Sequence, residues 1–345
     1  MMKFPKIIEN EQQLEELLSR PTAEVVDLFK TLDGDIIFLG IAGKIGPSIA
    51  RMAKRTCDEA GVSKRIIGVS RFSNEQEQKQ IEGFGIETIR GDLLDPDFVN
   101  SLPKVKNVIF LAGMKFGAEG NLSLTWAMNT YVPALVASHF KDSRIVAFST
   151  GCVYPLVPVE SGGSVETDRP DAIGEYAQSC LGRERMFEYG SLKYGTPVSL
   201  IRLNYAVEMR YGVLVDIAYK VKNELFVDLS MGYFNIIWQG DMNAMSLQAL
   251  SHCSSPAKVI NITGPGTLSV RQVALEFGEL FGKTPKFIGA EAPTALLSNA
   301  GLSQNLFGKP KVTPEQIIQW IANWISHENR LLNERTHFEV RDGKY

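Results

Sequence analysis

The sequence predicts an α/β protein whose core is a doubly wound parallel sheet with helices on both faces. Three observations predict this class. Short apolar runs alternate with longer helical patterns from Asp35 onward, which is the order of repeated strand–helix–strand units. The first run leads through a glycine-rich turn into a helical pattern. The chain has 345 residues, which is enough for such a domain and a second, smaller lobe.

The predicted strands are mostly continuous apolar runs, as expected for strands that are covered on both faces. In chain order they are Ile36–Leu39, Arg65–Val69, Asn107–Leu111, Arg144–Phe148, Val198–Arg202, Phe234–Trp238 and Val259–Ile262. Later apolar spacing predicts helices over Val270–Phe281 and Thr313–Ile325.

Residues 8–33 come before the first strand and show the apolar spacing of helices. Pro21 predicts a break between two helices, because the residue before a proline is biased away from helical geometry. Thr22 is then placed to cap the second helix. We therefore expect a helical extension over residues 1–34, ahead of the sheet domain.

Composition excludes several classes of protein. The formal net charge is −3, with 44% hydrophobic and 22% charged residues, so nothing favours a nucleic-acid or membrane partner. The start of the chain has no apolar run typical of a signal peptide. The four cysteines form no CxxC pair and the four histidines show no metal-ligand spacing. We expect a cytoplasmic protein with reduced thiols and no metal site.

The glycine-rich turn after the first strand predicts a dinucleotide site of the Rossmann type. It reads Gly40-Ile41-Ala42-Gly43-Lys44-Ile45-Gly46, a GxxGxxG spacing, and a helical run follows. Glycines let the backbone approach a pyrophosphate, and the free N–H groups of the helix N-terminus favour an anion. We expect Gly40, Gly43, Lys44, Ile45 and Gly46 to contact the cofactor.

The end of the second strand bears on the choice of cofactor. A site for NAD usually carries an acid here, bonded to the ribose 2′-hydroxyl. This chain has Ser70 followed by Arg71. An uncharged side chain beside a cation tolerates a 2′-phosphate better than a carboxylate does, so the sequence favours NADP over NAD.

Further motifs are similar to those of the NAD-dependent epimerase/dehydratase family, the extended branch of the short-chain dehydrogenase/reductases, from about residue 35 to residue 330. Gly91-Asp92-Leu93-Leu94-Asp95 resembles its adenine-contacting segment, and Leu111-Ala112-Gly113 resembles the "LAA" segment that lines the cofactor. Phe148–Tyr154 resembles "FSSxxVYG". The remaining matches are Asn129, Arg202-Leu203-Asn204, Asp241 and Asn261–Gly264.

The resemblance implies a domain arrangement and a set of cofactor contacts. It implies a dinucleotide-binding domain over residues 35–204, to which the later strands near 234–238 and 258–262 return. Residues 205–232 and 265–330 would form a smaller, mostly helical substrate lobe, and residues 331–345 a polar tail. Besides the turn, the implied cofactor contacts are Ser70, Arg71, Asp92, Leu93, Leu111, Ala112, Gly113, Asn129, Tyr176 and Asn204.

The resemblance also implies a reaction centre, and one position departs from the family. Its pattern is "YxxSKxxxE", in which a tyrosine acts as acid or base and a lysine lowers the tyrosine pKa. Here the segment begins at Tyr176, and Cys180 stands in place of the lysine. Thr150 matches the family's catalytic hydroxyl. Because a free tyrosine has a pKa of about 10, it is a poor base at neutral pH without a nearby cation.

Three interpretations of Cys180 stay open at the level of sequence. In the first, another cation substitutes, either Lys115, which follows Leu111-Ala112-Gly113, or the oxidised nicotinamide ring. In the second, Tyr176 acts only as a proton donor or another group is the base. In the third, redox chemistry has been lost and the protein only binds a dinucleotide.

The sequence as a whole predicts an NAD(P)-dependent oxidoreductase, epimerase or dehydratase that acts on a sugar or sugar derivative. The alternative is a non-catalytic dinucleotide-binding regulator. The resemblance also implies a homodimer that pairs through two helices of each subunit, here about Leu122–Phe140 and Gly174–Leu192.

Overall fold

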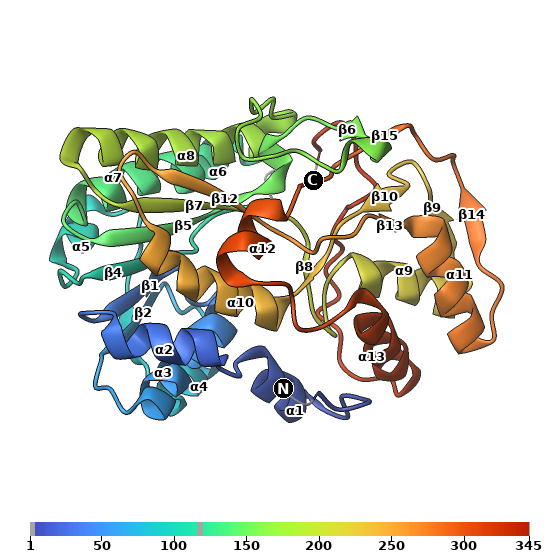
Figure 1. Cartoon of the computed structure of the whole chain (residues 1–345), viewed down its shortest axis with the longest axis horizontal. Helices are drawn as coiled ribbons and strands as arrows, with labels where there is room; N and C mark the ends of the chain where they lie inside the picture. The colour runs from blue at the N-terminus through green and yellow to red at the C-terminus, as the bar shows by residue number, and fades with distance from the viewer. Residues whose placement is uncertain (1–3, 116–119, 345) are drawn as a thin grey trace.

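The computed structural model describes residues 4–115 and 120–344, and its centre is a seven-stranded, wholly parallel sheet (Figure 1). The strand order is β3-β2-β1-β4-β5-β7-β12. Successive strands are added outward from β1 on one side and from β4 on the other, which leaves a crevice between them at the carboxyl ends. The predicted fold class is confirmed. The strands are β1 (Ile36–Leu39), β2 (Ile66–Ser70), β3 (Glu87–Arg90), β4 (Asn107–Phe110), β5 (Arg144–Thr150), β7 (Val198–Leu203) and β12 (Lys258–Ile262).

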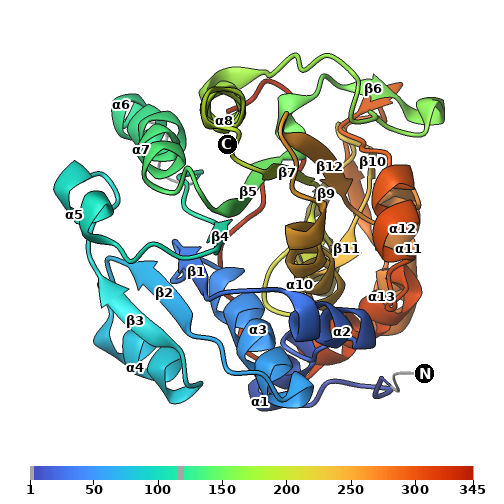
Figure 2. The ribbon, with the colours of Figure 1, turned by 60° about the vertical axis from the view of Figure 1, so that its left-hand side comes forward.

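Helices cover both faces of this sheet, as Figure 2 shows. One face is covered mainly by α2 (Ala23–Thr31), α3 (Gly46–Ala60) and α10 (Gln239–Gln248). The other is covered by α5 (Pro96–Ser101), α7 (Val132–His139) and α8 (Gly174–Tyr194). Apart from the edge strand β3, the strands are buried along almost their whole length because both faces are packed, which explains their continuous apolar sequence. At the sheet margins lie α4 (Glu75–Gly83) beside β3 and α12 (Gly301–Phe307) beside β12.

The N-terminal extension forms two helices that break at Pro21, as predicted. These are α1 (Glu11–Leu18) and α2, and the Thr22 hydroxyl accepts a hydrogen bond from the backbone N–H of Val25 at 3.4 Å. Buried leucines of α1 join the core of the C-terminal lobe, whereas Phe29 of α2 packs into the core under the sheet. The extension therefore connects the two hydrophobic cores.

The C-terminal lobe is helical, with four two-stranded ladders at its margins. The predicted helices are confirmed as α11 (Val270–Phe281) and α13 (Pro314–Ser326), which pack with α9 (Val213–Lys222). In the described residues, no helix is long and apolar enough to cross a membrane. The ladders pair β6 (Val157–Pro158) with β15 (Thr294–Ala295), β8 (Ala206–Val207) with β11 (Ile237–Trp238), β9 (Phe226–Asp228) with β14 (Lys286–Ile288), and β10 (Tyr233–Phe234) with β13 (Leu268–Ser269).

Two details of the predicted strands are wrong. Residues 234–238 do not form one strand that returns to the main sheet, because β10 and β11 belong to separate ladders. Between them the Asn235 side chain bonds the backbone of Gly266 and Ser298 at 2.9 Å, which holds the chain out of a single extended run. The prediction also missed β3, an edge strand whose outer residues Glu87 and Arg90 are exposed and hide its pattern.

The helix predicted over residues 122–140 is present but interrupted. It consists of α6 (Leu122–Trp126), a π-helical turn at Ala127–Tyr131 and α7. Asn129 lies in the π turn and is fully buried against α8. Such a turn adds a residue to the helix and re-aims its side chains, and here it turns Asn129 toward the crevice loop after β4.

The chain after α13 is not the free polar tail that its composition predicts. Residues 329–344 have no regular secondary structure, yet Thr336 is 2% exposed and Phe338 is 1% exposed. Phe338 belongs to the core of the C-terminal lobe. In Figure 1 this segment, in dark red, runs from the region of α13 to an end beside α8, where the Gly343 main chain lies against Gly174.

Candidate active site

The crevice at the carboxyl ends of the strands holds two adjoining cavities. The larger has a volume of about 550 Å³ and the smaller about 260 Å³. They share several residues of the glycine-rich turn and of the loop after β4, which makes them two ends of one crevice. Most of the residues predicted to form the site line one of them. The larger contains Gly40, Gly43, Lys44, Ile45, Gly46, Leu111, Gly113, Lys115, Thr150, Tyr176 and Asn204, and the smaller adds Ser70, Arg71, Asp92, Leu93 and Ala112.

The glycine-rich turn has its shape because two of its glycines admit no side chain. Gly40 has φ of 89°, and a Cβ there would lie 2.7 Å from the Ala112 backbone. At Gly46, the first residue of α3, a Cβ would lie 2.0 Å from the Ile41 carbonyl oxygen. Strand, turn and helix therefore pack backbone to backbone. The N-terminus of α3 therefore lies at the edge of the larger cavity, where the helix dipole favours an anion.

The smaller cavity brings together the ends of β2 and β3. Ser70 and Arg71 follow from β2, and Asp92 follows β3. Asp92 accepts a hydrogen bond from the backbone N–H of Leu94 at 3.0 Å, which fixes the turn that carries Leu93. Glu77, in the first turn of α4, also lines this cavity, and burial raises the pKa of its carboxyl group. The sequence prediction did not include Glu77. The signal that could have found it is the pair of glutamates, Glu75 and Glu77, in the first turn of the helix that follows β2.

Asn129 lies behind the cavity wall rather than in it. Its side chain accepts from the backbone N–H of Met114 at 2.9 Å, and it donates to the Met114 carbonyl and to Ser179, both at 2.9 Å. It therefore fastens the loop after β4 to helix α8. Because that loop carries Lys115, Asn129 positions Lys115 through the backbone.

One end of the larger cavity, formed by β5 and α8, contains Thr150 and Tyr176, and we call it the reaction end because the resembled family has its catalytic groups at these positions. Thr150 is the last residue of β5, and its hydroxyl accepts from the Cys152 N–H at 3.1 Å. Tyr176 lies in the first turn of α8. Burial, together with the thiols of Cys180 and Cys152, raises the pKa of Tyr176 well above its ordinary value, and Arg183 opposes this shift. At neutral pH the tyrosine hydroxyl therefore carries its proton.

Cys180 is fully buried and does not line either cavity. It packs with Val153, Tyr154, Tyr176 and Leu181. Burial raises the pKa of its thiol, so the group is neutral at physiological pH. Cys180 cannot supply the positive charge that the resembled family provides at this position.

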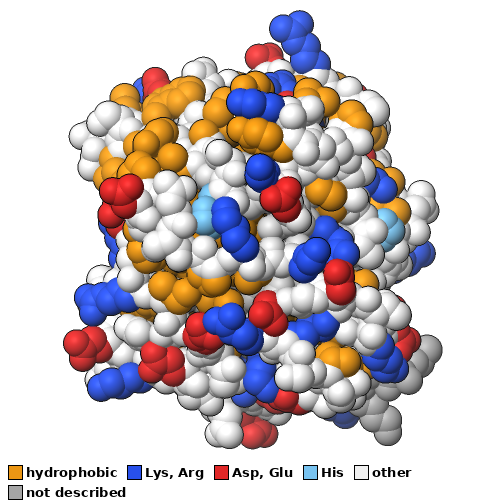
Figure 3. Space-filling model, turned by 90° about the vertical axis from the view of Figure 1, so that its left-hand side faces the viewer, with side chains coloured by type: hydrophobic (Ala, Val, Ile, Leu, Met, Phe, Trp, Pro, Cys, Tyr) orange, Lys and Arg blue, Asp and Glu red, His pale blue; other side chains and the backbone are white. Residues whose placement is uncertain are grey.

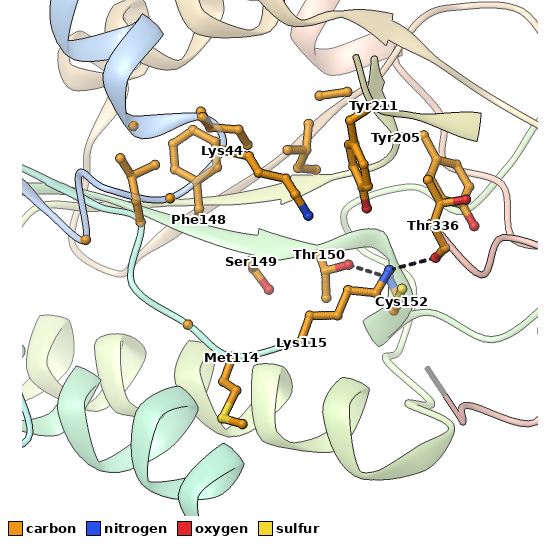
Figure 4. Close-up of a pocket in the computed structure, with 18 of the residues that line it drawn as sticks. Lys44, Met114, Lys115, Phe148, Ser149, Thr150, Cys152, Tyr205, Tyr211 and Thr336 are labelled. Atoms are coloured by element: carbon orange, nitrogen blue, oxygen red, sulfur yellow. Dashed lines mark hydrogen bonds between the residues drawn. The ribbon is translucent and has the colours of Figure 1, made fainter. Parts of the chain in front are cut away.

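Lys115 reaches the reaction end from the loop after β4. Its Nζ lies 5.9 Å from the centre of the Tyr176 ring and donates to the main-chain oxygen of Thr336 at 3.2 Å. Figure 4 shows its side chain extending toward Thr150 and Cys152. Burial lowers the pKa of this amine. The structure thus brings Lys115, Thr150 and Tyr176 into one cavity.

Arg183 is a second cation at this end, which the sequence prediction missed. It lies seven residues after Tyr176 on α8 and lines the larger cavity. Its guanidinium donates to the Phe148 carbonyl at 2.7 Å and to Asn129 at 2.6 Å, and its Nε is buried without a partner in the described residues. The spacing was a usable signal, because residues seven apart share a helix face.

The remaining walls of the larger cavity come from segments that no motif marked, and one of these segments contacts the glycine-rich turn. Lys44 in the glycine-rich turn lies 4.0 Å above the centre of the Tyr211 ring and forms an ion pair with Glu334. Tyr205 and Thr336 also face this space in Figure 4. Within the described parts of the chain, no group of three or more His, Cys, Asp or Glu side chains is arranged to hold a metal ion.

The parallel sheet, its glycine-rich turn and the crevice at the point where strand order reverses define a Rossmann-type fold. Among solved structures, the fold is similar to UDP-glucose 4-epimerase from Thermotoga maritima, with a TM-score of 0.71 and 17% identity over 85% of this chain and 99% of that one. UDP-glucuronic acid 4-epimerase from Bacillus cereus gives a TM-score of 0.71 and 16% identity over 85% and 99% of the two chains.

A third similar structure belongs to another reaction class. It is dTDP-glucose 4,6-dehydratase from Streptomyces venezuelae, with a TM-score of 0.72 and 15% identity over 85% of this chain and 97% of that one. At these identities the likeness establishes a shared fold. No family model and no curated protein matches the sequence.

Proposed function

We propose that this protein is a nicotinamide-dinucleotide-dependent enzyme that oxidises, reduces, epimerises or dehydrates a sugar derivative. The observation that carries the proposal is one crevice with two different ends. One end has a glycine-rich turn at a helix N-terminus, and the other has Thr150, Tyr176 and Lys115. A dinucleotide laid along the crevice would bring its reactive ring beside the tyrosine hydroxyl.

The similar structures support this substrate class. The T. maritima epimerase was solved with UDP-glucose, the B. cereus epimerase with a UDP-glucuronic acid analogue and NAD, and the S. venezuelae dehydratase with NAD. Their reactions differ, so the fold supports sugar chemistry at a nicotinamide rather than one particular reaction. Nucleotide-linked sugars are the first candidates for this chain.

The residues present fit a dinucleotide. A side chain at Gly40 or Gly46 would collide with the backbone, so the turn keeps an open cradle at the start of α3. Gly43, Lys44 and Ile45 would line the pyrophosphate beside the N-terminus of α3, and Ser70, Arg71 and Asp92 would meet the adenosine half. When bound, the nicotinamide supplies hydride exchange with the substrate carbon.

The protein's own groups would then handle the proton. Thr150 would share the substrate oxygen with Tyr176 and orient it. Tyr176, protonated at neutral pH, would donate its proton to a substrate carbonyl or, in the opposite direction, need a cation to accept one. Lys115 and Arg183 are the nearby cations that would favour the phenolate in place of the missing lysine.

We further propose a preference for NADP. Arg71 and Ser70 at the end of β2 support it, and Glu77 in the same cavity opposes it, because a carboxylate repels a 2′-phosphate. The expected preference is therefore modest.

The alternative function is a non-catalytic dinucleotide-binding regulator. It is favoured by Cys180, a buried neutral thiol where the resembled family has a lysine, and by the raised pKa of Tyr176. A regulator would bind the dinucleotide but convert no substrate.

Turnover separates the two functions. Purified protein would be incubated with NAD or NADP and a panel of UDP-sugars, dTDP-sugars, sugar acids and neutral sugars. The absorbance of reduced nicotinamide detects net oxidation or reduction, and chromatography of the sugars detects epimers and dehydration products, which leave the cofactor unchanged. Conversion that Tyr176→Phe abolishes supports the enzyme. Dinucleotide binding without any conversion across the panel supports the regulator.

We also propose that the chain forms a homodimer through α6, α7 and α8. Large hydrophobic side chains are exposed on α6, on the π turn that follows it and on or next to α8, and Figure 3 shows hydrophobic side chains gathered over the upper part of the end of the molecule nearest α7 and α8. Pairing of the same surface in two copies would bury them. Light scattering at micromolar concentration should give twice the chain mass, and a monomer would refute the proposal. The exposed hydrophobic side chains of this proposed interface are Leu122, Trp126, Tyr131, Ile173, Tyr189, Leu192 and Tyr194.

A further inference from the structure

The segment after α13 lines the crevice with Glu334 and Thr336 and is anchored to the C-terminal lobe. We name residues 331–344 the C-terminal strap. Asp216 of α9 accepts hydrogen bonds from the Thr336 backbone N–H at 2.9 Å and from its hydroxyl at 2.5 Å. Phe338 is buried in the core of the lobe. Arg341 donates to the Thr294 carbonyl at 2.8 Å and to its hydroxyl at 2.7 Å. The strap is therefore a fixed part of the fold.

Glu334 is the residue of the strap that stands where several spaces meet. Its side chain lines the larger active-site cavity, a cavity of about 500 Å³ in the C-terminal lobe and one of about 590 Å³ beside α1 and α3. All three spaces lie along the glycine-rich turn or the strap. Glu334 therefore forms the partition between the cofactor crevice and the spaces around it.

The partner of Glu334 is Lys44 of the glycine-rich turn. The side chains are 50% and 28% exposed, so the ion pair is open to water. Lys44 is also held over the Tyr211 ring. The second lysine of the cavity, Lys115, contacts the strap too, through the Thr336 carbonyl. Both lysines thus face oxygen atoms that the strap provides.

We propose that the Glu334 carboxylate holds the place of a ligand phosphate at Lys44, and that a phosphate-bearing ligand displaces it when it binds. Glu334 would then be a specificity-determining residue that sets how tightly the site takes pyrophosphate groups. The inference rests on the proposed function, because it places a pyrophosphate at this turn. The phosphate could come from the dinucleotide or from a nucleotide-linked sugar, and binding measurements separate these sources.

Two physical features make the exchange feasible. A partly exposed ion pair contributes little to stability, so releasing Lys44 costs little. The strap is held independently at Thr336, Phe338 and Arg341, so Glu334 can swing away while the strap stays in place. A pyrophosphate carries more charge than a carboxylate and would also lie at the positive end of the α3 dipole. It therefore competes well for Lys44.

The test is calorimetric binding of three probes to the full chain and to Glu334→Gln. The probes are NAD, UDP-glucose and inorganic pyrophosphate. Glu334→Gln should bind at least one of them roughly two- to fivefold more tightly, the equilibrium equivalent of a weak, partly exposed ion pair. A gain with NAD assigns the phosphate to the cofactor, and a gain with UDP-glucose assigns it to the substrate. No gain with any probe overturns the inference.

The matched control is Glu339→Gln, which removes the same charge from the same segment. Glu339 pairs with Lys220 at 3.3 Å, on α9. Glu339→Gln should bind the three probes as tightly as the unmodified chain does. If it gained as much affinity as Glu334→Gln, only the overall charge would matter, and the inference would be overturned. Circular dichroism confirms that each variant is folded.

A double-mutant cycle with Lys44→Gln provides the sharper test. If Glu334 acts through Lys44, Glu334→Gln changes nothing in the Lys44→Gln background, and the same gain in both backgrounds contradicts the inference. Failure of the proposed function has a different signature, because it would be an absence of turnover in the substrate panel. The pyrophosphate measurements decide the role of Glu334 even in that case.

Discussion

The two ends of the crevice are built in different ways. The adenosine end is formed by turns that directly follow β1, β2, β3 and β4, so its residues are set by where each strand stops. The reaction end combines the end of β5, the first turns of α8, the loop after β4 and the C-terminal strap. Some of these segments lie far apart in the sequence. The Lys115–Thr336 hydrogen bond joins residues that are 221 positions apart.

The difference has a chemical consequence. The glycine-rich turn would bind its ligand mainly through the backbone. Its shape therefore depends on residues that permit the turn, such as Gly40 and Gly46. At the reaction end, charge matters, and it can come from any segment that packs nearby. Under the proposed function, Lys115 or Arg183 can therefore take the place of the lysine that the resembled family has where Cys180 stands, whereas the loss of a turn glycine has no remote substitute.

The largest expected effect is on stability, from Cys180→Lys. The side chain at this position is fully buried beside Arg183, so a lysine would be a buried charge next to a like charge. We expect the free energy of unfolding to fall by about 3–5 kcal/mol. Urea denaturation measures it, with Cys180→Ser as the control. A stable variant with faster turnover would show that the pocket still accepts the lysine of the resembled family.

The second prediction tests the tyrosine. Tyr176→Phe should lower turnover by at least ~100-fold, because it removes the acid–base group. Dinucleotide affinity should be nearly unchanged, since the adenosine end is intact. Steady-state kinetics and calorimetry measure the two quantities. Tyr189→Phe, a change in the same helix at a residue that does not line the cavity, should leave both unaltered. Normal turnover in Tyr176→Phe would end the catalytic assignment.

The third prediction concerns pH. A cation near Tyr176 favours its phenolate and lowers the tyrosine pKa, so loss of the cation raises that pKa. If Lys115 stays charged until Tyr176 ionises, against the burial that lowers the pKa of its amine, Lys115→Met should move the rising limb of the activity profile up by about one pH unit. Lys193→Met is the control, because that lysine also lies over tyrosine rings but is outside the cavity. An unshifted limb would transfer the role to Arg183.

The smallest expected effects are at the adenosine end. Arg71→Ala should narrow the preference for NADP over NAD, and Glu77→Gln should widen it, each by about fivefold or less because both side chains interact across water. Calorimetry with the two dinucleotides gives the ratio. Tighter binding of NAD by the unmodified chain would reject the NADP proposal.

Much of the fold could be predicted from local sequence. The alternation of apolar strands and helices, the cap at Thr22 and the glycine-rich turn all depend on neighbouring residues, and the structure confirms them. Strand β3 could not be predicted this way, because an edge strand buries too little of its surface to show a pattern. The run at 234–238 was misread because the side-chain bonds of Asn235 break it, and its partners are distant in the chain.

The sequence by itself determined the parallel sheet and the glycine cradle, because each follows from residues within strand–turn–helix units, whereas the Tyr176 and Thr150 pair was implied by the resemblance to known motifs. Only the tertiary structure decided which cations lie near the tyrosine and that the last residues are part of the site. Thr336 and Glu334 carry no local signal, since a polar segment gains its position from partners such as Asp216 and Lys44 elsewhere in the chain. Apolar periodicity shows which residues of a segment are buried. It contains no information about which residues of a distant segment will contact them.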